Sequence, residues 1–93
     1  MTIGKFGRVR PTRAVHAREF DGEMVLLNLE KGEYFGLDEL GARLWRGLEM
    51  GKSVSEIALQ IAPDHDVEPD RLLTDLVALT DELVRRGLAE PVS

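Results

Sequence analysis

Residues 15–37, VHAREFDGEMVLLNLEKGEYFGL, alternate apolar segments with two turn signals. Asp21-Gly22 is typical of a two-residue hairpin turn, because both turn positions need a positive φ. Lys31-Gly32 is a second, weaker signal of the same kind. Together the two turns predict a three-stranded antiparallel sheet. Its expected strands are Val15–Phe20, Glu23–Leu29 and Glu33–Leu37.

The third strand, Glu33–Leu37, is expected to lie at an edge of the sheet, because no further strand follows it. An edge strand presents unpaired backbone N–H and C=O groups. Two-residue turns also predict the register of the second and third strands. The expected pairs are Leu29 with Tyr34, Asn28 with Phe35, and Leu26 with Leu37.

Both faces of the predicted sheet are apolar, although only one can pack on helices in a two-layer fold. The second face is either a contact surface or is covered by a helix or the N-terminal segment. One face carries Val25, Leu27, Leu29 and Tyr34, and the other carries Met24, Leu26, Phe35 and Leu37.

Two helices are expected after the sheet. Asp38 is the predicted N-cap of the first, and Gly51 stands where a glycine commonly follows a helix end. Ser53-Val54-Ser55-Glu56 has the pattern of a capping box, so it predicts the start of the second helix. Pro63 ends that helix, because proline cannot continue the backbone hydrogen bonding.

A third helix is expected between Pro69, which suits a first helical turn, and Gly87, which suits the position after the last. Its apolar residues recur at spacings of three and four. Strands followed by helices predict the α+β class. We therefore expect a winged-helix-like fold, with a three-stranded antiparallel sheet followed by three helices.

The size and composition of the chain limit the function. Ninety-three residues form one domain with one modest core. The absence of cysteine excludes disulfides, thiolate catalysis and cysteine metal ligands. The N-terminus lacks a secretory signal, and the longest apolar run, Met24 to Leu27, is far too short to span a membrane. These features predict a cytoplasmic protein without a membrane partner.

Charge is unevenly distributed along the chain, whose net charge is −5. Residues 1–18 hold five cations and no acid, so the remainder is strongly acidic. We expect residues 1–13 to form a basic tail and residues 14–90 to form the domain. The tail is either solvated and partly disordered, or it contacts an acidic partner or the acidic body. An acidic body argues against a nucleic-acid partner.

No catalytic motif occurs in the chain, and we predict no enzyme activity, no catalytic residue and no cofactor. Asp64-His65-Asp66 is the one metal-like cluster, but it lacks the glycine and terminal glutamate of a calcium loop, so we predict no metal site. A DNA-binding regulator remains an alternative. Against it, residues 69–86 carry a net charge of −1, and a helix that enters the major groove is normally basic or neutral.

The predicted edge strand is the best candidate for function. Gly36 lies inside it, and an interior glycine permits close approach of another backbone. An extended peptide can add to such an edge as a fourth strand. If the third helix packs beside the strand, its residues could form the wall of a groove, although for any single leucine a place in the core is the simpler interpretation. These residues are Leu72, Asp75, Leu76, Leu79 and Leu83.

An ordered set of segments resembles the PqqD-like family, the peptide-recognition elements of pathways that modify ribosomally made peptides. The resemblance covers about residues 14–90. It rests on Val25–Asp38, on Gly41-Ala42-Arg43-Leu44-Trp45 with Leu48, on Gly51-Lys52-Ser53-Val54 with Glu56-Ile57, and on Arg86-Gly87-Leu88.

This resemblance implies a winged-helix-like fold that binds a leader peptide antiparallel to the third strand, in a groove against the third helix. It implies contacts at Glu33, Tyr34, Phe35, Gly36 and Leu37, and at Leu72, Asp75, Leu76, Leu79 and Leu83. The stretch L-N-L-x-x-G-x-Y-F is similar to stand-alone leader-binding proteins of lasso peptide biosynthesis. The implied partners are a precursor leader peptide and a separate leader peptidase. The protein would be a monomer or an edge-paired dimer. A PqqD-type peptide chaperone of another pathway is the closest alternative.

Overall fold

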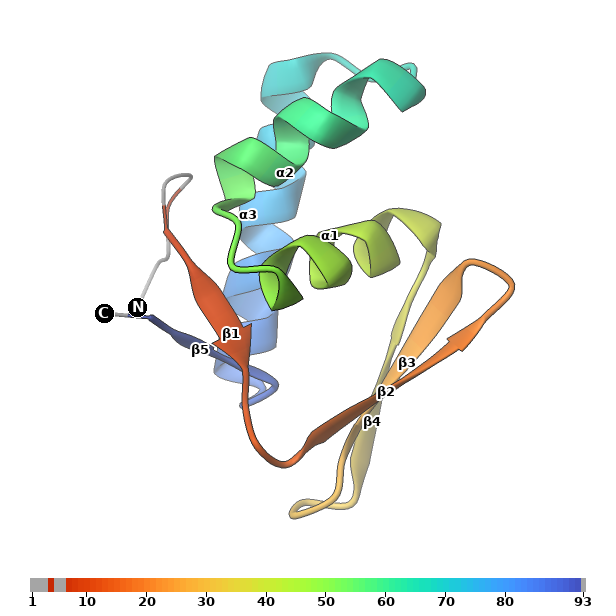
Figure 1. Cartoon of the computed structure of the whole chain (residues 1–93), viewed down its shortest axis with the longest axis vertical. Helices are drawn as coiled ribbons and strands as arrows, with labels where there is room; N and C mark the ends of the chain where they lie inside the picture. The colour runs from red at the N-terminus through yellow and green to blue at the C-terminus, as the bar shows by residue number, and fades with distance from the viewer. Residues whose placement is uncertain (1–3, 5–6, 93) are drawn as a thin grey trace.

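The computed structural model describes Gly4 and residues 7–92. Five strands and three α-helices follow one another along this part of the chain (Figure 1). The strands are β1 (Val9–Pro11), β2 (Val15–Phe20), β3 (Glu23–Asn28), β4 (Glu33–Leu37) and β5 (Ala89–Pro91). The α-helices are α1 (Glu39–Glu49), α2 (Val54–Ile61) and α3 (Pro69–Arg85), with a single 3₁₀ turn at Ala62–Asp64.

The predicted three-stranded antiparallel sheet is confirmed, with the strand order β2-β3-β4. Asp21 and Gly22 join β2 to β3 with φ values of 49° and 86°. Both values are positive, as the Asp-Gly signal requires. The sheet projects away from the helices, and only its inner side lies against α1 (Figure 1).

The predicted register between β3 and β4 is wrong by two residues. Tyr34 pairs with Leu27 and Phe35 pairs with Leu26, because the connection is longer than the expected two-residue turn. Asn28 causes this difference. Its side-chain Oδ1 accepts the backbone N–H groups of Glu30 and Lys31 at 3.1 and 3.2 Å, and its carbonyl accepts the N–H of Gly32. A shift of two leaves each side chain on its predicted face.

The helix boundaries largely follow the predicted signals. Asp38 caps α1 by accepting the N–H of Gly41 at 2.8 Å, and Gly51 follows the helix with a φ of 78°. Ser53 and Glu56 form the capping box of α2. Pro69 is the first residue of α3, and Gly87 follows its end with a positive φ.

The core lies between the inner face of the sheet and the helices. Met24, Leu26 and Leu37 are buried, so the face that carries them packs inward. The opposite face carries Tyr34, which is 76% exposed, and Phe20, which is 61% exposed. The structure thus identifies the core face that the sequence left open. The helices contribute Leu44, Trp45, Leu48, Val54, Ile57, Ile61, Leu72, Leu76 and Leu83 to the core.

A second, two-stranded sheet was not predicted. β1 pairs antiparallel with β5, so both ends of the described chain lie together beside α3 (Figure 1). Val9 is buried, and the hydroxyl of Thr12 donates to the carbonyl of Gly87 at 2.8 Å. Val9–Pro11 therefore belong to the folded domain, in contrast to the predicted tail at residues 1–13. Residues 1–3, 5 and 6 of that predicted tail lie outside the described residues.

The α+β class is confirmed by the three-stranded sheet and three helices. The element order differs from the prediction, since a short strand precedes the main sheet and another follows the helices. The winged-helix likeness stays a prediction. Within the part of the chain that the structure describes, no helix has the length and apolarity needed to cross a membrane.

Candidate peptide-binding edge

β4 is an edge of the main sheet and pairs with β3 alone in the described part of the chain. The backbone N–H of Leu29 donates to the carbonyl of Ala14, so odd-numbered residues of β3 point their backbone groups at β2. The even-numbered residues of β3 must then bond to β4, where their partners are Glu33, Phe35 and Leu37. It follows that the N–H and C=O groups of Tyr34 and Gly36 point outward from the edge.

Gly36 leaves this edge sterically open. A Cβ built on Gly36 would meet no atom within 4 Å, and its φ is not in the left-handed region. Its strand neighbour across the sheet is Val25. The edge therefore offers outward backbone groups at Tyr34 and Gly36 without a bulky side chain at the second position.

α3 approaches β4 through its last turn. The guanidinium carbon of Arg86, which directly follows α3, lies 5.0 Å from the centroid of the Phe35 ring. Positions three or four residues apart share one side of a helix. Arg86 therefore marks the side of α3 that also carries Glu82, Leu79 and Asp75.

The predicted groove residues of α3 fall into two groups. Leu72, Leu76 and Leu83 are 1%, 1% and 0% exposed, so their side chains form core and present no surface to a peptide. Asp75 is exposed and Leu79 is half-buried. Asp75 and Leu79 lie on the side of α3 that Arg86 marks. The three buried leucines pack into the core. A role in peptide binding stays a prediction for all five residues.

The predicted strand residues lie together along the edge. Phe35 and Leu37 turn their side chains toward the core face, and Phe35 remains half-buried. Tyr34 and Gly36 lie on the outer face, while Glu33 begins the strand. A peptide strand beside β4 would thus contact Phe35 and α3 with alternate side chains, and Tyr34 and Gly36 with the others.

Glu82 orients the end of α3. Its carboxylate accepts from Nε of Arg86 at 3.0 Å and also pairs with Arg85. The hydrogen bond from Arg86, followed by the charge of Arg85, lowers the pKa of Glu82 below its usual value. Glu82 is therefore ionised at neutral pH and holds Arg86 in place over Phe35.

Sequence reasoning did not identify Arg86, Glu82 or Asn28 as groove residues. In the sequence, Arg86 appeared only in the Arg86-Gly87-Leu88 segment of the family resemblance. Arg86 lies seven residues after Leu79 and Glu82 lies three residues after it, so helical spacing predicts that all three share one side of α3. Asn28 is the one polar residue of β3 that faces the core, and an isolated polar residue in an apolar run requires a partner.

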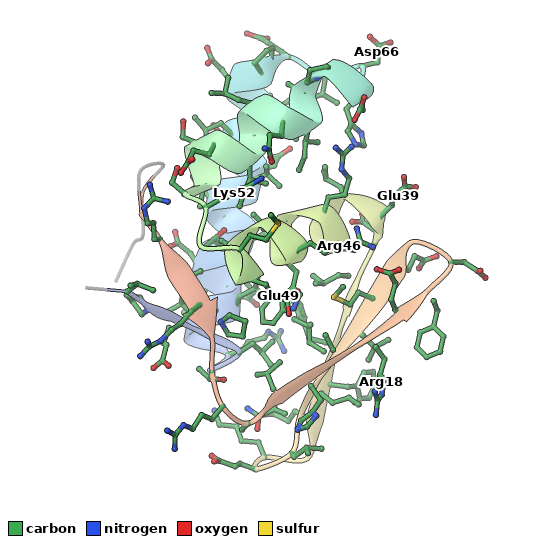
Figure 2. The ribbon with its side chains drawn as sticks, in the orientation of Figure 1. Arg18, Glu39, Arg46, Glu49, Lys52 and Asp66 are labelled. Atoms are coloured by element: carbon green, nitrogen blue, oxygen red, sulfur yellow. The ribbon has the colours of Figure 1, made fainter. Side chains whose placement is uncertain are left out.

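The sheet has a second edge at β2, but its surroundings differ. Glu19 pairs with Arg46 of α1, and Arg18 stands on the outer face of the strand. Figure 2 shows Arg18 on the side of the sheet away from the helices. Charged side chains on an edge strand oppose the addition of a further strand. The more favourable edge is therefore β4, which carries Gly36 and adjoins α3.

The Asp64-His65-Asp66 segment lies in the connection between α2 and α3. Asp64 forms an ion pair with Arg43 at 3.0 Å. Asp66 lies at the end of the molecule far from the sheet (Figure 2). Among the described residues, no group of three or more histidine or acidic side chains is arranged to hold a metal ion.

Comparisons with known proteins agree with this fold. The family model of coenzyme PQQ synthesis protein D (PqqD) matches residues 23–89. The solved structure of TbiB1 in complex with the TbiA(beta) leader peptide is 36% identical; the match covers 90% of this chain and 98% of that one, with a TM-score of 0.82. Lasso peptide synthetase B1 complexed with the leader peptide is 28% identical, with coverage of 90% and 99% and a TM-score of 0.83. No curated protein matches the chain. Because the family model spans more than half of its length, this chain belongs to the PqqD family, which confirms the resemblance that its sequence suggests.

Proposed function

We propose that this protein binds the leader segment of a ribosomally synthesised precursor peptide by β-strand addition to β4. We further propose that it delivers the bound leader to a separate leader peptidase in lasso peptide biosynthesis. In this proposal the protein itself is not an enzyme. Its contribution is to hold an extended peptide in one register.

The single observation that supports this proposal best is the outward edge of β4 beside α3. Tyr34 and Gly36 offer backbone donors and acceptors, and Phe35 offers half-buried apolar surface beside them. Leu79 is half-buried on the side of α3 that Arg86 marks. The two solved relatives were both obtained with a leader peptide, and they share this fold over almost the whole chain.

The expected affinity is consistent with a site of this size. A dissociation constant between micromolar and tens of nanomolar corresponds to about 8–10 kcal/mol. Each backbone hydrogen bond contributes roughly 1 kcal/mol net. Two or three side chains buried along Phe35 and Leu79 would supply most of the remainder, at about 1.5–3 kcal/mol each.

Hydrogen exchange tests the proposed mode directly. The probe is a synthetic copy of the TbiA(beta) leader peptide, which is the peptide in the solved complex of the 36% identical TbiB1. Binding should slow exchange of the Tyr34 and Gly36 amides, which point outward, while the amide of Phe35 is already protected by β3. If the peptide binds and the Tyr34 and Gly36 amides exchange at unchanged rates, strand addition to β4 is wrong.

Delivery to a peptidase needs a separate test. Cleavage of a leader-bearing precursor by a separate leader peptidase should be accelerated by this protein at concentrations that saturate the leader. A variant that cannot bind the leader should give no acceleration. Equal cleavage with and without the protein would contradict delivery, while leaving leader binding intact.

A further inference from the structure

A narrow pocket opens beside the start of β4. Its lining residues are Asn28, Glu33, Tyr34, Phe35, Arg86 and Leu88. Its volume is about 10 Å³, which is room for one water-sized group. The pocket therefore admits one oxygen atom of an incoming polar group, and a bulkier group would require Arg86 to move aside.

Asn28 supplies a donor to this pocket. The residue is 4% exposed, and its Oδ1 is committed to the backbone N–H groups of Glu30 and Lys31. These two contacts fix the orientation of the amide, so Nδ2 is the remaining polar atom. Among the described residues, Nδ2 has no protein acceptor, yet it is not sealed from solvent. An incoming carboxylate can replace water at this donor, and a charge-assisted hydrogen bond is stronger than a neutral one.

Arg86 also lines the pocket and supplies a second donor. Nε of Arg86 bonds to Glu82, and one face of the guanidinium lies over Phe35. Arginine has five N–H donors, so the two terminal nitrogens remain able to bind a carboxylate. Half of the Arg86 side chain is exposed, so it can adjust to a ligand.

From these contacts we propose that the pocket binds the carboxylate of one acidic side chain of the bound peptide. This inference rests on the proposed strand addition to β4. Peptide residues opposite Tyr34 and Gly36 would point to the outer face, whereas the residue opposite Phe35 points toward α3. An acid at that position can reach the pocket, and glutamate has the longer side chain. Asn28 and Arg86 thereby determine which peptide register is preferred.

Glu33 opposes this preference. Glu33 lines the same pocket, and its negative charge repels a second acid. Glu33→Gln should therefore strengthen the binding of an acidic peptide and leave a neutral peptide unaffected. A gain in affinity in Glu33→Gln, opposite to the loss expected for Arg86→Gln, would distinguish a charge effect from a general loss of structure.

The test uses peptides selected on the wild-type protein from a randomised 15-residue display library. A selected peptide with a glutamate is synthesised with and without replacement of that residue by glutamine, and both affinities are measured by fluorescence anisotropy. The wild type should prefer the glutamate peptide by about ten-fold, as a charge-assisted hydrogen bond implies. Arg86→Gln should remove the preference. Asn28→Asp should also remove it, because aspartate keeps the acceptor for the loop but loses the Nδ2 donor.

Arg85→Gln is the matched control, since Arg85 also pairs with Glu82 but is not a lining residue of the pocket. It should keep the full preference for the glutamate peptide. Equal affinities of the wild type for the two peptides, or a preference that persists in Arg86→Gln, would overturn the inference.

Gly36→Pro distinguishes a failure of the carboxylate pocket from a failure of strand addition. If it abolishes binding of both peptides while the wild type shows no preference, only the carboxylate pocket is wrong. If it has no effect, or if the library yields no binder, strand addition fails and the pocket proposal fails with it.

Discussion

Arg86 lies over the ring of Phe35, and this contact joins the end of α3 to the exposed strand β4. A cation over an aromatic face contributes about 0.5–1 kcal/mol at a partly exposed site. Its greater consequence is geometric. The contact places one side of α3 next to the edge strand β4. Among the described strand edges, only that of β4 combines an interior glycine, Gly36, with a half-buried apolar neighbour, Phe35.

Leu79→Asp should weaken leader binding while the protein remains folded. Leu79 is half-buried on the side of α3 marked by Arg86, so the substitution removes apolar surface from the groove. We expect an affinity loss of about ten-fold or more, because a buried leucine contributes about 1.5–3 kcal/mol. Fluorescence polarisation with a labelled leader peptide measures the change.

Two control variants test whether the loss of leader affinity in Leu79→Asp is specific to that position. Arg71→Ala, near the start of α3, should leave affinity within about two-fold. Leu76→Asp should instead unfold the protein, because Leu76 is almost fully buried. A folded Leu79→Asp protein with unchanged affinity would show that the groove lies elsewhere.

Gly47→Ala should destabilise the fold by about 1–3 kcal/mol through overpacking. A Cβ on Gly47 would lie 2.5 Å from Cγ1 of Ile57, so α1 and α2 could no longer approach as closely. Chemical denaturation measures the loss. Gly36→Ala is the matched control and should change stability little, since its Cβ would meet no atom within 4 Å.

The cause of that loss can be tested with a second substitution. Ile57→Ala removes the clashing atoms at its own cost in stability. The double variant Gly47→Ala/Ile57→Ala should therefore lose less stability than the sum of the two single losses. Strict additivity would mean that Gly47 is not required for the contact with Ile57.

Glu56→Gln should make stability less dependent on pH. The hydrogen bonds from Ser53 and then from Arg8 lower the pKa of Glu56 below its usual value near 4.5. A carboxylate with a lowered pKa in the fold adds stability above its unfolded pKa, and this stability is lost as pH falls through its folded pKa. Wild type should thus be more stable than Glu56→Gln at pH 7, and the difference should shrink as the pH falls below about 4.5. A difference in melting temperature that stays constant between pH 7 and pH 3 would contradict this role.

The sequence determined most of the local structure, because its strongest signals are chemical requirements of single positions. Asp21-Gly22 specified one turn, and Ser53 with Glu56 specified one helix start. The β3–β4 register was wrong because the Lys31-Gly32 pair suggested a two-residue turn. In the structure, Asn28 organises a four-residue loop through its side chain.

The rest of the fold and site depends on contacts between distant segments. β1 and β5 are three residues long and each contains a proline, so neither has a strand pattern of its own. Each of these two segments forms a strand because it pairs with the other. The helical spacing also could not separate half-buried Leu79 from fully buried Leu72, since both recur at the same period. Only the position of Arg86 over Phe35 shows which side of α3 adjoins β4.

Leader affinity in Gly36→Pro and Gly36→Ala is the most direct measurement of the central claim. Proline removes an outward N–H and is tolerated at an edge strand, so β3–β4 pairing should survive, as circular dichroism can verify. The account predicts an affinity about ten-fold or more weaker for Gly36→Pro and nearly unchanged for Gly36→Ala. A folded Gly36→Pro protein that binds the leader as tightly as the wild type would contradict it.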